Sequence, residues 1–230
     1  GVGNPVIQAS YGGDVNNVAS VGTALVSVTT ATTGLGVTCA NSSCTATLTG
    51  FFGSVTGETV SWGQAGTGAV SFTAGTTCNL SAGGTCSVPV KAAAVGSVTV
   101  TASYPGDANN QPTSGSVTFT VSTPSVAVSC IPATFGITNT SQCTATLSGF
   151  SGTVTGETIA WSQSGTGAVT FSGGGTCALS AAGTCQVTIT GTTAGTLTVT
   201  AAYSADAENL ANSGTSTTLT GTKSTTSLAG

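Results

Sequence analysis

The sequence predicts an all-β protein built from tandem sandwiches of antiparallel sheets. Residues 44–86 and 143–185 are identical at thirty of 43 positions, at a fixed offset of 99 (161 − 62 for the two tryptophans). Short apolar/polar alternations separated by glycine-rich turns run through both copies, a pattern typical of half-buried strands. The offset is too long for a solenoid repeat and fits a whole sandwich of ~100 residues.

The composition agrees with this fold class. Charged residues make up only 3% of the chain, whereas ~25% is usual for soluble domains. Valine and threonine are abundant, and branched side chains suit a pleated strand. Without basic patches the chain is not expected to bind nucleic acid. No apolar run approaches the ~20 residues of a membrane span.

The alternation places the strands of the first repeat and their inward faces. Leu35, Leu48, Val60, Trp62 and Val100 are among the side chains expected in its core, and the second repeat has equivalents. No helix is predicted. The strands are expected near residues 34–39, 43–49, 58–63, 69–73, 77–81, 85–91, 97–104 and 115–122.

A Tyr-x-x-Asp-x-x-Asn turn occurs three times, beginning at Tyr11, Tyr104 and Tyr203. Each lies between alternating strands and therefore predicts a hairpin. Only two copies have a full repeat before them. We therefore expect a closing hairpin of an incomplete domain at 1–30, domains at 31–122 and 123–220, and a lead-in strand to a further domain at 221–230.

No site for catalysis is predicted. The chain lacks histidine, so a serine or cysteine nucleophile has no usual base. Lys91 has threonine as its counterpart, so the repeats share no lysine chemistry. We expect no enzymatic activity and no cofactor. The six carboxylates are expected mostly on turns, so fold stability should depend little on pH.

Two kinds of polar site stay open. Asp14, Asp107 and Asp206 carry oxygens that calcium prefers, but calcium needs six to eight ligands. Capping of its own turn by each aspartate explains the same pattern without a metal. The sequons at Asn41, Asn79 and Asn139 are glycosylation candidates, although chance also produces such triplets in a chain rich in serine and threonine.

The eight cysteines predict disulfides rather than a zinc site. Their gaps are irregular and histidine is absent, which does not match zinc-ligand spacing. Disulfides place the protein outside a reducing cytoplasm. Cys78 and Cys86 flank a turn and should face each other across a hairpin. The expected pairs are local in sequence: Cys39–Cys44, Cys78–Cys86, Cys130–Cys143 and Cys177–Cys185.

The order of these features resembles bacterial and archaeal Ig-like repeats. The resemblance runs from the first cysteine through CTATL, the tryptophan strand and the C-x₇-C pair to the tyrosine turn, and covers nearly the whole chain. Such repeats occur in tandem in adhesin stalks, surface filaments and surface layers. The resemblance implies immunoglobulin-like sandwiches, although these cysteines depart from the antibody pattern.

The function expected from these features is structural. The chain would be a non-enzymatic module of an extracellular filament or cell-surface stalk. Its partners would be copies of itself or adjacent repeats, joined head to tail by strand complementation or as tandem repeats. The alternative is an adhesin whose loops bind a glycan or a protein. Binding loops usually carry exposed aromatic residues, and only Phe51, Phe52, Phe135 and Phe150 have no clear place in a core.

Overall fold

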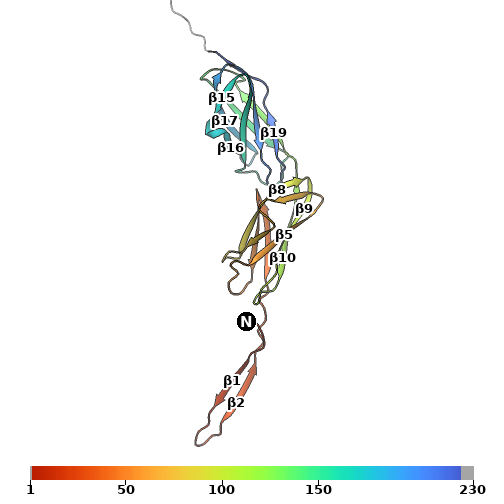
Figure 1. The fold of residues 1–230 in the computed structure, drawn as a ribbon, viewed down its shortest axis with the longest axis vertical. Coiled ribbons are helices and arrows are strands. Elements are labelled where there is room, and N and C mark those ends of the chain that lie inside the picture. The colour runs from red at the N-terminus through yellow and green to blue at the C-terminus, as the bar shows by residue number, and fades with distance from the viewer. Residues whose placement is uncertain (1, 224–230) are drawn as a thin grey trace, which may run out of the picture.

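The computed structural model describes residues 2–223, which form an elongated all-β chain (Figure 1). A two-stranded hairpin lies at one end, and two β-sandwiches follow it along the long axis. The predicted fold class is confirmed. The described residues contain no α-helix, and a single 3₁₀ turn spans Ser172–Gly175. None of their helices could therefore cross a bilayer.

The hairpin consists of β1 (Val6–Tyr11) and β2 (Ser20–Leu25), which, among the strands of the described residues, pair only with each other. The first sandwich has two four-stranded sheets, ordered β3-β4-β8-β6 and β10-β9-β5-β7. All pairs in both sheets are antiparallel. Its strands are β3 (Gly34–Ala40), β4 (Ser43–Thr49), β5 (Thr59–Gly66), β6 (Ala69–Phe72), β7 (Thr77–Asn79), β8 (Thr85–Ala94), β9 (Gly96–Tyr104) and β10 (Thr113–Val121).

The second sandwich repeats this plan with two changes. Its closing strand is split into β19 and β20, both paired with β18, and an added strand β12 pairs in parallel with β20. Its strands are β11 (Ser125–Ile131), β12 (Thr134–Gly136), β13 (Thr140–Ser148), β14 (Thr158–Gly165), β15 (Ala168–Phe171), β16 (Thr176–Ala178), β17 (Thr184–Thr193), β18 (Gly195–Tyr203), β19 (Asn212–Thr215) and β20 (Leu219–Thr222).

Each sandwich has its own core between its sheets. In the first, Leu48 and Val88 from one sheet pack with Val60, Trp62 and Val100 from the other. Equivalent residues fill the second core. The division of the chain at residues 30, 122 and 220 stays a prediction. The closing strand β20 extends to Thr222, and residues 224–230 of the expected lead-in strand lie outside the described residues.

Four disulfides join the cysteines in the sequence-local pairs. Cys39 and Cys44 face each other on neighbouring strands of one sheet, and Cys130 and Cys143 do the same. The expected hairpin geometry for Cys78 and Cys86 is wrong. β7 belongs to the sheet of β5 and β8 to the sheet of β4, so this bridge, with Cα atoms 5.8 Å apart, connects the two sheets.

The tryptophans lie against the bridges between sheets. The indole N–H of Trp62 donates to the sulfur of Cys78 at 3.1 Å. Trp161 makes the same contact with Cys177, also at 3.1 Å. A buried indole needs a partner for its N–H. The bridge therefore supplies a polar contact inside each core as well as a covalent link.

Candidate docking site at the tyrosine turns

The three Tyr–Asp–Asn turns have the same internal hydrogen bonds. In the second, Tyr104 donates its hydroxyl to Asp107 Oδ2 at 3.1 Å, and the Asn110 N–H donates to Asp107 Oδ1 at 2.8 Å. The tyrosine bond is 2.6 Å at Tyr11 and 2.7 Å at Tyr203. Each carboxylate thus caps its own turn, which is the metal-free explanation of the pattern.

These hydrogen bonds shift the ionisation of the turn. The Tyr11 hydroxyl and the N–H of Asn16 lower the pKa of Asp14 to about 2. The Asn110 side chain and the Asn109 N–H lower the pKa of Asp107. Burial, followed by the bond to Asp107, raises the pKa of Tyr104 to about 12. The first two turns therefore keep a carboxylate and a neutral phenol side by side at neutral pH.

In each of the two sandwiches, the asparagine of the turn also forms hydrogen bonds to a neighbouring loop. The Asn110 side chain accepts from the Phe52 N–H at 2.7 Å and donates to the Phe52 carbonyl at 3.1 Å. Asn209 holds Ser151 in the same way. In the hairpin, the hydrogen bonds of the Asn17 side chain are to Asp14 within the turn. Turn and loop together form one end of each sandwich.

The turn of the second sandwich is seated on the first. The Ala207 N–H donates to the Asn41 carbonyl at 2.6 Å, and the Ala92 N–H donates to the Asp206 carbonyl at 2.5 Å. Ala207 is 0% exposed and belongs to the first core. Asn41 has φ of +51°, a conformation that asparagine tolerates better than most residues. We call the surface around Asn41 and Ala92 the open pole.

Docking and packing bury carboxylates that the sequence places on exposed turns. Asp206 is 2% exposed, so the expectation of surface carboxylates is wrong for this residue. Burial, reinforced by the negative charge of Asp206, raises the pKa of Glu157 and of Glu208. The local sequence could not reveal this, because Asp107 lies in a similar turn and is only half-buried.

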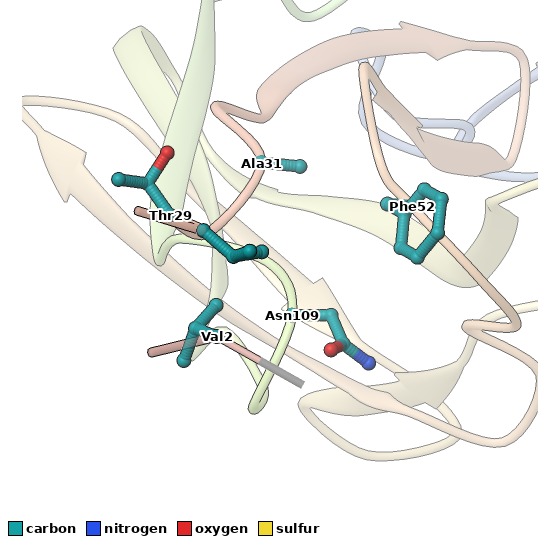
Figure 2. A pocket seen from close by; sticks show the side chains of 6 residues that line it. Val2, Thr29, Ala31, Phe52 and Asn109 are labelled. Carbon is teal, nitrogen blue, oxygen red and sulfur yellow. The ribbon is translucent and has the colours of Figure 1, made fainter. Parts of the chain in front are cut away.

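Within residues 2–223, no other sandwich is seated on the matching turn of the first sandwich. Ala108 is the counterpart of Ala207 and is exposed. Phe52, beside it, is 71% exposed. A cavity of about 260 Å³ separates this end from the base of the hairpin, and Figure 2 shows Val2, Thr29 and Phe52 around it. The turn of the first sandwich is therefore open at the position where the turn of the second sandwich contacts its neighbour.

The hairpin matches the closing strands of the first sandwich in register. Ile7 pairs with Ala24 as Val100 pairs with Val117, when the tyrosines of the two turns are aligned. Val100 is 0% exposed, whereas Ile7 is 60% exposed. The apolar face that packs in the sandwich is thus open to solvent in the hairpin.

Gly22 of the hairpin also matches a residue of the first sandwich in register, Gly115. It pairs with Ala9 as Gly115 pairs with Ala102. A Cβ on Gly115 would collide with the carbonyl oxygen of Leu35 in β3, whereas a Cβ on Gly22 would meet nothing within 4 Å. Glycine in a strand often marks a close approach of another backbone. The hairpin keeps this glycine without the strand that requires it.

The remaining candidate residues do not gather into one site. Within residues 2–223 there is no group of three or more His, Cys, Asp or Glu placed to hold a metal. Asn41, Asn79 and Asn139 are exposed and lie in different parts of the chain. Of the four unplaced aromatics, Phe135 is buried, Phe51 and Phe150 pack partly against the cores, and Phe52 is exposed.

No protein-family model and no curated protein matches the sequence. In structure, the chain is similar to the D0-D1 domain of intimin, with 17% identity and a TM-score of 0.32, covering 80% of this chain and 95% of that chain. It is also similar to the Yersinia pseudotuberculosis adhesin InvE, with 17% identity and a TM-score of 0.35, covering 83% of this chain and 58% of that one.

The surface layer protein SbsC, domains 1–6, is a further neighbour, with 14% identity and a TM-score of 0.27 over 97% of this chain and 36% of that one. By their names, these neighbours include an adhesin and a surface layer protein. Each sandwich is immunoglobulin-like. That assignment rests on the two packed, mainly antiparallel sheets and on the tryptophan strand, which is β5 between β9 and β7 in the first sandwich and β14 between β18 and β16 in the second.

Proposed function

We propose that this chain is a non-enzymatic structural module of an extracellular filament or cell-surface stalk. In this proposal, immunoglobulin-like sandwiches follow one another head to tail. Each is completed by strands of its own kind, and a tyrosine turn joins the second sandwich to the first. Four disulfides support the extracellular location, because such bonds persist in oxidising surroundings.

The hairpin is the observation that carries the proposal. A two-stranded hairpin is marginal in water by itself, and this one has an exposed apolar face and a glycine suited to a crossing backbone. Its occupant would be strands equivalent to β3–β8 of the first sandwich. They would come from preceding residues of a longer chain or from a neighbouring subunit that accepts the hairpin. A contact of this type does not close on itself and therefore generates a linear series.

Gly22→Val tests the proposal, because a side chain there would block the approaching strand. In electron micrographs of the native assembly or of the purified chain, we expect linear particles that the variant shortens or abolishes. Thr23→Val, a neighbouring exposed position on the other face of β2, is the matched control. Linear particles of unchanged length in Gly22→Val would contradict strand completion of the hairpin. Intact mass of the native protein separates a longer chain from a subunit assembly.

An adhesin is the second candidate, and Phe52 is the observation that favours it. An exposed aromatic ring beside a cavity is a usual feature of binding sites. Glycan-array binding that Phe52→Ser removes, by monodisperse particles, would support the adhesin. Loss of particle length in Phe52→Ser without any glycan binding would support the joint instead.

A further inference from the structure

The two sandwiches differ at the pole that carries the connection between their first two strands. In the first sandwich this connection is the short turn Asn41–Ser42, which leaves the open pole free for the turn of the second sandwich. In the second sandwich, Cys143 lies 13 positions after Cys130, whereas in the first Cys44 lies only 5 positions after Cys39. We call residues 131–142 the cap segment.

The cap segment folds back over its own sandwich. β12 pairs in parallel with β20, and Phe135 is buried in the second core. The Thr138 N–H donates to the Gly191 carbonyl at 2.9 Å, and the Gly191 N–H donates to the Asn139 carbonyl at 3.0 Å. The Ser141 hydroxyl donates to the Pro132 carbonyl at 2.7 Å within the segment.

Gly191 is the counterpart of Ala92, at the same offset of 99 (191 − 92). The amide of Ala92 donates to a carbonyl of the next sandwich, Asp206. The amide of Gly191 donates to a carbonyl of its own cap segment, Asn139. A buried backbone amide needs an acceptor. At the open pole the next sandwich provides it, and at the pole of the second sandwich the cap segment provides it.

We propose that the cap segment takes the place of a docked tyrosine turn. The open pole of the first sandwich is a docking surface, and the partner it fits is the Tyr–Asp–Asn turn of an immunoglobulin-like sandwich. The corresponding pole of the second sandwich is closed by its own cap segment and accepts no such turn. A series of sandwiches that uses this joint therefore ends at the second sandwich.

The residues at the closed pole are adapted to the cap segment. A Cβ at Gly191 would lie 2.9 Å from the Gly136 carbonyl oxygen and 3.3 Å from the Phe135 ring. The open pole has alanine at this position. Thr138 has φ of +72°, which is unfavourable for a β-branched residue and persists only where contacts enforce it.

Moving the cap segment tests the proposal in the full chain. In the variant, residues 131–142 replace residues 40–43 of the first sandwich, together with Ala92→Gly. The transplanted segment should displace the second sandwich, so the Ala207 amide should exchange hydrogen roughly tenfold faster, as expected for one lost hydrogen bond. Amides of β13 and β17 should keep their protection. Ala92→Gly alone is the matched control and should leave Ala207 protected.

Unchanged protection of Ala207 in a folded transplant variant would overturn the proposal. Should the transplant lose the near-ultraviolet signal of Trp62, Gly191→Val decides instead. Its side chain should push the cap segment away and raise exchange at Thr138 and at residue 191 roughly tenfold. Unchanged exchange at both amides would then overturn the proposal. These readouts are intramolecular, so the absence of filaments would count against the proposed function and leave this inference intact.

Discussion

The Ala207 amide donates to the Asn41 carbonyl at 2.6 Å, so the turn that closes the second sandwich also contacts the first. The bond joins two backbone groups and requires no particular side chain at either position. It does require that both side chains be small or directed away. Ala207, which is fully buried, meets that condition.

Ala207→Trp should therefore disrupt the contact between the sandwiches. A large side chain in a packed position costs about 1–3 kcal/mol, and here the two sandwiches can separate to relieve it. We expect faster hydrogen exchange at the Ala92 amide, with the amides of β4 and β13 still protected. Ala108→Trp is the matched control at the exposed counterpart and should change neither. Equal protection of Ala92 in both variants would contradict the described contact.

Tyr203→Phe should destabilise the second sandwich by about 1–3 kcal/mol, the usual cost of leaving a buried polar group without one of its partners. The group concerned is the carboxylate of Asp206, which loses the hydroxyl donor at 2.7 Å. Tyr11→Phe removes the same bond in the exposed hairpin and should have an effect within about 0.5 kcal/mol. Thermal unfolding of both variants provides the comparison. Equal shifts would argue against a special role for burial.

The folding stability should depend on pH through two contributions of opposite sign, one from Glu157 and one from Asp107. Burial raises the folded-state pKa of Glu157 above the usual 4.5. Its contribution to stability is therefore fully present below the unfolded pKa and is lost as the pH rises through the folded value. The lowered pKa of Asp107 acts in reverse, with stability lost as the pH falls below the unfolded value.

Glu157→Gln isolates the first of these contributions. The variant lacks the loss of stability that accompanies ionisation of Glu157. Its unfolding free energy relative to the natural chain should therefore be higher at pH 7 than at pH 4. Urea unfolding at the two pH values measures the difference. A relative stability that is the same at both, or that falls towards pH 7, would show that the glutamate is not desolvated.

Removing the bridge between sheets should cost more than removing the bridge within a sheet. From loop lengths alone, Cys78→Ala/Cys86→Ala should lose about 2.5 kcal/mol and Cys39→Ala/Cys44→Ala about 2 kcal/mol. The first pair should also alter the near-ultraviolet signal of Trp62, whose N–H loses its sulfur acceptor. Non-reducing peptide mapping should find all four local bridges. A bridge between the two sandwiches would contradict the pairing.

The strands and the central core were predictable because they depend on local periodicity. Leu48, Val60 and Trp62 occupy alternate positions in strands, and each is buried as expected. Val55 and Leu80 are just as buried but lie outside the strands of the structure, where alternation does not reveal their burial. Backbone hydrogen bonds link both residues to Glu58: the Glu58 N–H donates to the nearby Val55 carbonyl, and the Leu80 N–H donates to the Glu58 carbonyl from a segment 22 positions away (80 − 58).

The docking site was less predictable, because it depends on contacts between repeats. Ala108 and Ala207 follow equivalent aspartates, yet one is exposed and the other buried. The burial of Phe135 could not be predicted, because β12 pairs with β20, which is the last strand of the sandwich in sequence order. The longer gap between Cys130 and Cys143 did signal a difference between the repeats. Its meaning required knowing that Gly191 and Ala92 find different acceptors.

The short span of each disulfide has a mechanical consequence. In the first sandwich the bridges enclose only the stretches 39–44 and 78–86. If tension along the chain unfolded this sandwich, nearly all of its residues could be pulled straight. Each would then contribute about 3.3–3.6 Å to the length of the extended chain. A bridge between strands distant in sequence, as in antibodies, would hold much of that length back. A thread built from such units could yield by a long distance under load without breaking a covalent bond.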